Sequence, residues 1–301
     1  MENSHLHRTG VRNSPKTKIW QCEYCNIQFI EPHFDNLSTY YREEYRKQHE
    51  SVIATPQTAM QRYESQRATT KQAARSIKEL VPDGGSVLDI GCSAGGLLSH
   101  LEDAYELYGA EWNPEDAQFV REAGYPCEEG ELSEIYPGKR FTLITAVQVL
   151  EHQPDPVQFL KDIKEKLIGG GYLYMEMPNI DDALLQMYDI PTYKDFWYRQ
   201  PHITYWNAYT LASLLTTLGF ESRIDFKQRY GLANHMHWLH TGMPMDNMVD
   251  AQKMLKPVAS DRLNGAALNR IWTSLDQQYR VQLRTLYHTD TLVVKARLMG
   301  I

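Results

Sequence analysis

Short apolar runs rich in β-branched residues alternate with helical patterns along the chain from about residue 81 onward. Such alternation is typical of βα units built around a parallel sheet. The hydrophobic pattern therefore predicts an α/β fold. The predicted strands are Ser86–Ile90, Glu106–Glu111, Tyr125–Glu128, Phe141–Val147, Gly171–Met177, Glu221–Gln228 and Thr291–Leu298.

The segments between these runs carry the polar signals of helix ends. In "EWNPEDAQFVREAG", Asn113 suits a helix N-cap, Pro114 suits the first helical position, and Gly124 suits the end. The same order of residues recurs from Asp155 to the glycines of "LIGGG", and from Asn207 to Gly219. Helices are therefore expected between the predicted strands.

The loop "GCSAGG", residues 91–96, follows the first predicted strand, and a helix is expected to begin near Ala94. Backbone N–H groups and a helix N-terminus at a strand's carboxyl end favour ligand binding. Ser93 stands at the third position, where a dinucleotide-binding G-x-G-x-x-G motif has glycine. Glu111, twenty residues after Gly91, suits both hydroxyls of a ribose. This pattern favours a nucleoside without a pyrophosphate, against the alternative of a purely structural loop.

Three segments in order resemble the motifs of class I S-adenosylmethionine-dependent methyltransferases: "VLDIGCSAGG", the acid Glu111, and "VLEHQPDPVQFLKDIKEKLIGGGYLYMEMPN". The resemblance spans roughly residues 60–230 and resumes at "DTLVVKARL". It implies a Rossmann-like, seven-stranded, mostly parallel sheet with helices on both faces and an antiparallel last strand. It also implies S-adenosylmethionine as the cofactor.

The resemblance further implies which residues bind that cofactor. The glycine-rich loop would line its methionine end, Glu111 would hold the ribose, and Trp112 would pack on the adenine, although Trp112 also suits simple packing. Glu131 and Leu132 are further adenine neighbours. The complete set of predicted cofactor-binding residues is Asp89, Gly91, Cys92, Ser93, Gly95, Glu111, Trp112, Glu131, Leu132 and Gln148.

The cofactor's sulfonium already activates its methyl group, so the protein must mainly align an acceptor, and a base helps when that acceptor is a hydroxyl. His152 in "LEHQPDP" and His202 in "RQPHITYW" are the candidate catalytic bases. The resemblance favours His202, while either histidine could instead be structural. Related ubiquinone-pathway O-methyltransferases carry E-x-x-E-H here and bind a cation. Gln148 replaces the first acid, so no such metal is predicted.

Residues 1–50 are predicted to form an N-terminal appendage with a knuckle and an aromatic helix. Its C-x-x-C pair, Cys22 and Cys25, resembles the zinc-ribbon-like leader of some bacterial methyltransferases that act on sugars. A structural zinc site needs four ligands, so two interpretations stay open: bound zinc, or a knuckle held by aromatic packing. Only His5, His7 and His33 could complete the zinc site.

Residues 51–301 are predicted to form the methyltransferase domain, with a lid insertion over 231–290. Tyr41 and Tyr45 of the appendage share a helix face and are predicted to contact the substrate. So are four lid residues, because hydrogen-bonding groups beside an aromatic ring suit a polyhydroxylated acceptor. They are Asn234, His235, His237 and Trp238. Later in the lid, apolar residues at helical spacing predict an amphipathic helix packed on the core. They are Leu268, Ile271, Trp272, Leu275 and Tyr279.

Composition narrows the functional class. A net charge of −7 disfavours nucleic-acid partners. No apolar run is long enough for a membrane span and no signal peptide is recognisable, so a cytoplasmic location is expected. The expected activity is O-methylation of a hydroxyl on a small-molecule or glycan acceptor, first a sugar or sugar-derived metabolite. A phenolic or quinone-like acceptor is the second candidate, and a non-catalytic, cofactor-binding regulatory subunit is the third.

Overall fold

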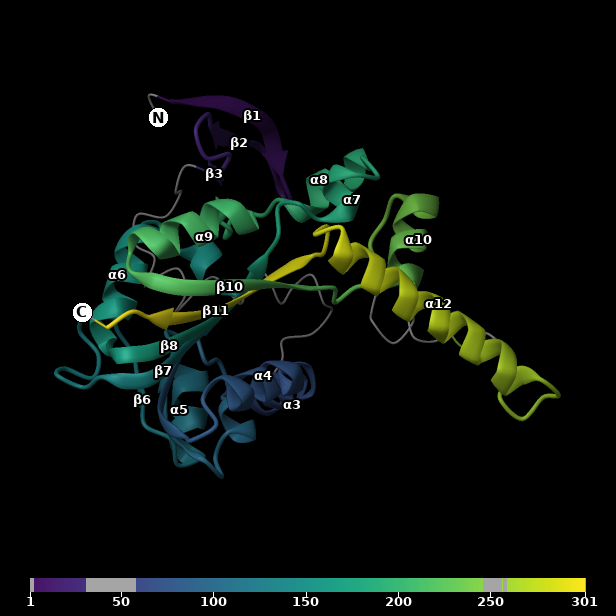
Figure 1. Ribbon diagram of the computed structural model, residues 1–301. Coiled ribbons are helices and arrows are strands. Elements are labelled where there is room, and N and C mark those ends of the chain that lie inside the picture. The colour runs from purple at the N-terminus through teal and green to yellow at the C-terminus, as the bar shows by residue number, and fades with distance from the viewer. Residues whose placement is uncertain (1–2, 31–57, 246–255, 257–258, 301) are drawn as a thin grey trace. The chain divides into compact units, whose positions relative to one another are not determined.

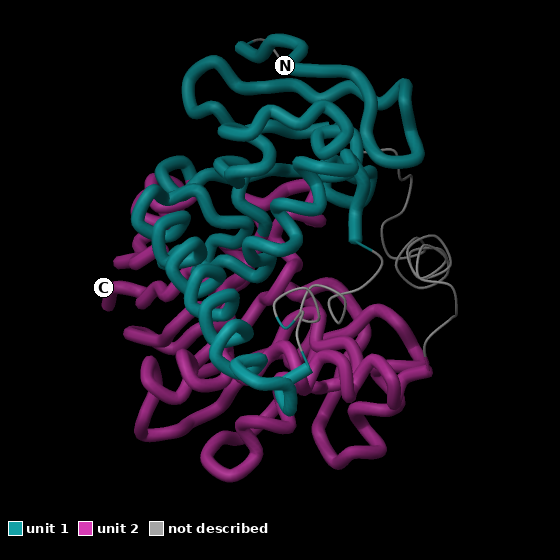
Figure 2. Tube along the Cα trace, turned by 90° about the vertical axis from the view of Figure 1, so that its right-hand side faces the viewer, with its two compact units in different colours: residues 1–31, 178–210, 225–293 teal, residues 32–177, 211–224, 294–301 magenta. Residues whose placement is uncertain are grey.

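The computed structural model describes residues 3–30, 58–245, 256 and 259–300 (Figure 1). The chain divides into two compact units (Figure 2). Unit 1 comprises residues 1–31, 178–210 and 225–293, and unit 2 comprises residues 32–177, 211–224 and 294–301. Within the part of the chain that is described, no helix combines the length and apolar character that crossing a membrane requires.

A seven-stranded, mostly parallel sheet carries the predicted α/β fold, and all seven predicted strands are present. The prediction of the fold class is therefore confirmed. In spatial order the strands are β10 (Phe220–Lys227), β11 (Thr291–Leu298), β8 (Leu167–Pro178), β7 (Phe141–Val147), β4 (Gly85–Ile90), β5 (Tyr105–Ala110) and β6 (Cys127–Glu128).

The central strands β4 and β7 are buried on both faces, as a parallel sheet between two helical layers requires. Their registers place Asp89 of β4 level with Thr145 of β7 and with Gly109 of β5. Because these strands run parallel, their carboxyl ends meet at one edge of the sheet. The loops after β4, β5 and β7 can therefore converge there.

Helices cover both faces of this sheet: α3, α4 and α5 lie on one side in Figure 1 and α6 and α9 on the other. The predicted caps are confirmed, because the side chains of Asn113, Asp155 and Asn207 accept hydrogen bonds from backbone N–H groups three residues on. The helices are α3 (Ala59–Thr69), α4 (Lys71–Leu80), α5 (Pro114–Glu122), α6 (Pro156–Lys166) and α9 (Ala208–Thr217).

The helix predicted to begin near Ala94 is wrong. The chain forms turns there, followed only by the short 3₁₀ helix η3 (Leu98–His100). Gly95 has φ 81°, a left-handed conformation that interrupts an α-helix. Helix α3 packs directly on this segment, since a Cβ added at Gly96 would lie 2.4 Å from the Cβ of Gln66. The loop is therefore not followed directly by the N-terminus of an α-helix.

Unit 1 contains a four-stranded antiparallel sheet in the order β1 (Ser4–Val11), β2 (Ser14–Cys22), β3 (Gln28–Ile30) and β9 (Thr204–Tyr205). The predicted knuckle is the turn between β2 and β3. The hydrophobic pattern does not predict these strands, because polar residues interrupt the alternation in "SHLHRTGV". A buried aromatic cluster packs under the sheet, and it includes Tyr193, Tyr198, Tyr205 and Trp238.

Unit 1 also contains the helices α7 (Ala183–Gln186), α8 (Pro191–Trp197), α10 (Leu232–Thr241) and α12 (Gly265–Thr285). Helix α12 confirms the helix predicted here, but the prediction that its apolar stripe packs on the core is wrong for four of the five residues, the exception being Tyr279, which packs against His235. Leu268, Ile271, Trp272 and Leu275 are 42–56% exposed. The buried face carries Asp276 and Leu283 instead, because Asp276 accepts the backbone N–H of Leu232 at 2.6 Å.

Candidate functional site

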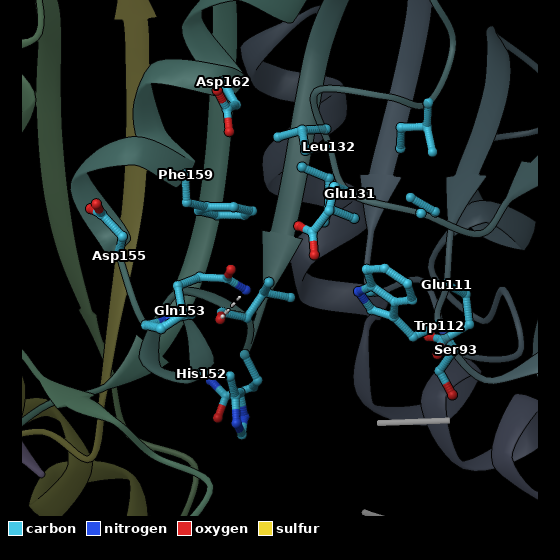
Figure 3. A pocket seen from close by; sticks show the side chains of 18 of the residues that line it. Ser93, Glu111, Trp112, Glu131, Leu132, His152, Gln153, Asp155, Phe159 and Asp162 are labelled. Carbon is cyan, nitrogen blue, oxygen red and sulfur yellow. Dashed lines mark hydrogen bonds between the residues drawn. The ribbon is translucent and has the colours of Figure 1, made fainter. Parts of the chain in front are cut away.

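A cavity of about 510 Å³ lies in unit 2, beyond the carboxyl ends of β4, β5 and β7 (Figure 3). This is the edge at which open α/β sheets bind ligands. The residues singled out from the sequence that line it are Gly91, Ser93, Glu111, Trp112, Glu131, Leu132, Gln148 and His152.

The glycine-rich loop closely approaches the loop after the neighbouring strand β7. Gly91 has φ 67°, and a Cβ added to it would lie 2.8 Å from Cγ2 of Val149. A side chain there would be strained and would also clash, so glycine satisfies two requirements at once. The backbone N–H groups of Gly91 and Cys92 donate to the carbonyl oxygen of Ala110, which ties the loop to the end of β5.

Glu111 is held in a defined orientation at the end of β5. One carboxylate oxygen accepts the backbone N–H of Ser93 at 2.8 Å, and the other accepts the backbone N–H of Asn113 at 2.7 Å. A carboxylate offers about four acceptor positions, so two backbone contacts fix its direction without exhausting its capacity. Glu111 is therefore arranged to receive hydroxyl donors from a ligand in the cavity.

Helix α3 contributes a buried arginine to the same region. Arg62 donates to Asp116 through Nε at 2.9 Å and through Nη2 at 2.6 Å, and Nη2 also lies 3.0 Å from Glu115. Burial lowers the pKa of Arg62, but the hydrogen bonds and charges of Asp116 and Glu115 outweigh that effect and raise it above its ordinary value. The ion pair joins α3 to the first turn of α5.

Three predicted cofactor-binding residues do not line the cavity: Asp89 at the end of β4, and Cys92 and Gly95 within the loop. Asp89 is buried and accepts a hydrogen bond from the Thr145 hydroxyl at 2.6 Å; burial is the main reason that its pKa rises to about 7. The buried sulfur of Cys92 lies 3.9 Å from that of Cys127. A Cβ added at Gly95 would meet the Val120 side chain at 3.2 Å.

Figure 3 shows Trp112 and Phe159 projecting from opposite sides of the cavity, with Glu131 and Leu132 between them in this view. Burial raises the pKa of Glu131, and so do the charges of Glu134 and Asp162. An indole face beside an exposed acid suits a planar, hydrogen-bonding heterocycle. This end of the cavity is therefore compatible with an adenine.

Sequence comparison identifies the family of the chain. Residues 63–223, more than half of the chain, match the family model described as a methyltransferase domain. The chain belongs to this family. Family membership implies S-adenosylmethionine as the methyl donor.

Curated relatives match the methyltransferase domain over shorter stretches. A ubiquinone biosynthesis O-methyltransferase of Coxiella burnetii is 28% identical over 113 residues, which cover 34% of this chain and 47% of that protein. The (S)-coclaurine N-methyltransferase of Papaver somniferum is 23% identical over 212 residues, covering 64% of this chain and 58% of that protein. The chain thus spans about half the length of the curated relatives it matches.

A solved structure shares the fold. The SAM-dependent methyltransferase from Archaeoglobus fulgidus aligns with a TM-score of 0.51 and 19% identity, over 77% of this chain and 94% of that one. At this level of identity the likeness concerns the fold of the methyltransferase domain, which agrees with the Rossmann-like sheet that the sequence predicted.

The two candidate bases of the methyltransferase lie in different units. His152 ends the 3₁₀ helix η4 (Leu150–His152), is buried, lines the cavity, and has its Nε2 4.0 Å from Glu151. Gln148, which also lines the cavity, has φ 58°. His202 belongs to unit 1, where it is buried with its ring centroid 6.1 Å from that of Tyr205. Its role as a base stays a prediction.

The predicted substrate residues that are described lie on α10 of unit 1. Trp238 packs in the aromatic cluster, with its ring centroid 4.9 Å from that of Tyr193. His235 is buried, contacts the Tyr279 hydroxyl at 2.7 Å, and has a pKa lowered to about 4, mainly by burial. Asn234 is buried and His237 is half-buried. Tyr41 and Tyr45 lie outside the described residues.

The described part of the appendage brings only two of the proposed zinc ligands together. Cys22 and Cys25 flank the turn between β2 and β3, while His5 lies 3.9 Å from Glu23 and His7 contacts Gln28. His33 lies outside the described residues. Among those that are described, no cluster of three metal-ligating side chains includes the two cysteines.

Two groups of cavity residues were missed from the sequence. Arg62 and Gln66 come from α3, where polar residues without apolar periodicity carry no signal for a site. The second group follows β7, in a segment that was quoted as a family motif and, from Asp155 onward, as a helix, without a binding role. A polar segment directly after a strand that ends at the ligand edge is a usable signal for them. They are Gln153, Pro154, Asp155, Gln158, Phe159 and Asp162.

Proposed function

We propose that this protein transfers a methyl group from S-adenosylmethionine to a hydroxyl of a sugar or sugar-derived metabolite. The observation that carries the proposal is the orientation of Glu111 at the edge of the cavity, where two backbone N–H groups aim its carboxylate. A carboxylate so placed suits both hydroxyls of a ribose. The sulfonium of the cofactor supplies the activated methyl group.

The residues of the chain bind and orient the reactants. Gly91 and Ser93 line the methionine end of the cofactor, Glu111 holds the ribose, and Trp112 packs on the adenine. Alignment of the acceptor with the donor supplies most of the rate enhancement. His202 accepts the proton of the acceptor hydroxyl, and His152 orders the loop after β7.

A phenolic or quinone-like acceptor is the second candidate. The matched Coxiella burnetii relative is named for ubiquinone biosynthesis, and it is similar to about a third of this chain. The buried contacts of His235 and Trp238 also weaken the case for a sugar-binding lid on α10. The chemistry of the transfer step is the same for both acceptor classes.

The test is to incubate the purified protein and isotopically labelled S-adenosylmethionine with fractionated cell metabolites and glycans. Mass spectrometry then identifies the molecule that gains the label, and Glu111→Ala serves as the matched control. Label on a sugar hydroxyl supports the proposal, whereas label on a phenol replaces the sugar with the second acceptor class. Cofactor binding without any transfer would indicate a non-catalytic subunit and contradict the proposal.

A further inference from the structure

Ser93 adopts a backbone conformation that glycine normally occupies. Its φ is 45°, and its neighbours Gly91 and Gly95 have φ 67° and 81°. A left-handed conformation at a residue with a Cβ costs free energy and persists only where surrounding contacts hold it in place. The conformation of Ser93 therefore calls for contacts strong enough to maintain it.

Two carboxylates supply those contacts. The backbone N–H of Ser93 donates to Glu111 at 2.8 Å, and its hydroxyl donates to Oδ2 of Asp116 at 2.7 Å. Hydrogen bonds to ionised acceptors are stronger than those between neutral groups. Both the backbone and the side chain of Ser93 are thus fixed, and the backbone bond is the one that also orients Glu111.

Asp116 connects this loop to two helices. Its side chain is fully buried in the first turn of α5, and its own N–H is capped by Asn113 at 3.1 Å. Its second oxygen, Oδ1, accepts both Nε and Nη2 of Arg62 from α3. The arginine thus pairs with one oxygen of the buried Asp116 side chain, while the other oxygen accepts the Ser93 hydroxyl.

We propose that Asp116 is a positioning residue of the cofactor site, acting through Ser93. It does not line the cavity. It maintains the left-handed conformation of Ser93, which directs the Ser93 N–H at Glu111 and so sets the direction of the carboxylate that faces the ribose. This inference rests on the proposed function, because it assumes that Glu111 binds the cofactor.

The first test measures S-adenosylmethionine affinity by calorimetry. Loss of a charge-assisted hydrogen bond is expected to make Asp116→Ala bind about tenfold more weakly or worse. Adding Ser93→Gly should restore most of that affinity, because glycine adopts this backbone conformation without strain. A double variant that binds as weakly as Asp116→Ala would overturn the proposal, since Asp116 would then act by a route other than the conformation of Ser93.

A second comparison decides the matter if Asp116→Ala does not fold. Ser93→Ala removes only the hydroxyl and leaves the Arg62–Asp116 ion pair intact. We expect Ser93→Ala to bind S-adenosylmethionine and S-adenosylhomocysteine several-fold more weakly than Ser93→Gly does. Equal affinities in the two variants would overturn the proposal.

Two further variants distinguish this proposal from a general loss of stability and from the proposed function. Tyr193→Phe deletes a hydroxyl-to-aspartate bond of equal length, 2.7 Å, in unit 1, so it should lower the melting temperature and leave cofactor affinity unchanged. A loss of affinity there matching that of Ser93→Ala would overturn the proposal. Glu111→Ala tests the proposed function itself. If Glu111→Ala weakens binding while Asp116→Ala does not, only the positioning role fails.

Discussion

Two hydroxyl-to-aspartate hydrogen bonds of the same length, 2.7 Å, occupy different settings in this protein. In unit 2 the bond joins Ser93 to Asp116, and in unit 1 it joins Tyr193 to Asp182. The first pair sits beside a ligand-sized cavity, which Ser93 lines. The second pair lies among other buried polar groups, next to the aromatic cluster.

Charge compensation distinguishes the two aspartates. Asp116 has the guanidinium of Arg62 at 2.6 Å. The pKa of Asp182 rises to about 7, first because of burial and then because of the charge of Asp290. The aspartate that pairs with a guanidinium holds the loop that lines the cavity, whereas Asp182 accepts a hydrogen bond within the packing of its own unit. Burial of polar groups alone therefore does not mark a binding site.

The largest expected effect is that of His202→Ala, a change in unit 1. A catalytic role for His202 would contradict a simple contrast between a functional unit 2 and a structural unit 1. General-base catalysis contributes about 10²–10⁴-fold, so His202→Ala should lower turnover by that order while S-adenosylmethionine affinity stays intact. His152→Ala should lower turnover by a smaller factor. Steady-state kinetics with the acceptor found in the labelling experiment checks the ranking. A reversed ranking, or losses of only a few-fold in both variants, would remove the base assignment and leave alignment as the main source of catalysis.

Glu111→Ala is expected to have the next largest effect. It removes charge-assisted hydrogen bonds to the ribose, each worth about 1.5–3 kcal/mol, so affinity for S-adenosylmethionine should fall by about 10- to 100-fold. Calorimetry measures the change, and circular dichroism shows whether the variant is folded. Unchanged affinity in a folded variant would end the ribose assignment and with it the functional contrast between the two units.

The next prediction concerns how the free energy of unfolding of Asp89→Asn depends on pH. The folded-state pKa of Asp89 is about 7 against an ordinary value of 3.8, so between these values the folded state binds more protons than the unfolded state. Stability contributed by the protonated carboxyl is therefore lost as pH rises from about 4 to 7, by about 1.4 kcal/mol per pKa unit. The free energy of unfolding, measured by denaturant titration at pH 5 and pH 8, should fall less in the variant.

In the wild type, the fall in the free energy of unfolding also includes a contribution from Asp182, whose pKa is likewise raised above its ordinary value. Asp89→Asn should accordingly flatten the pH dependence without abolishing it. An identical fall in wild type and variant would mean that Asp89 ionises in the folded protein as readily as in the unfolded chain.

The smallest expected effect is that of Tyr193→Phe. The variant loses one hydrogen bond to Asp182, worth about 1 kcal/mol net, so the free energy of unfolding should fall by about that amount. Thermal unfolding measures this change. Cofactor affinity should be the same as in the wild type, because the Tyr193–Asp182 bond, unlike the Ser93–Asp116 bond, does not belong to the proposed cofactor site. A weakened affinity would show that the unit 1 pair also supports the cofactor site.

Local rules in the sequence determined most of the sheet and part of the cavity. The strands follow from alternation and apolar runs, and the caps at Asn113, Asp155 and Asn207 follow from a preference that acts over three residues. Gly91 and Glu111 could be placed because both stand at the ends of strands that share one edge of the sheet. Such signals require only near neighbours along the chain and the geometry of parallel strands.

Only the tertiary structure decided the features that depend on residues distant in sequence. Arg62 and Asp116 are separated by 54 positions, and nothing in either segment indicates that they pair. Turns stand where a helix was expected after the loop, and α3 packs on those turns. The sequence does not show this packing, because it depends on the close approach of Gln66 to Gly96. Likewise, the spacing of the apolar stripe on α12 specifies a helix but not which face is buried, since Leu283 and Asp276 make the actual contacts. Periodicity determines the conformation of a segment, whereas burial depends on what the rest of the chain places against it.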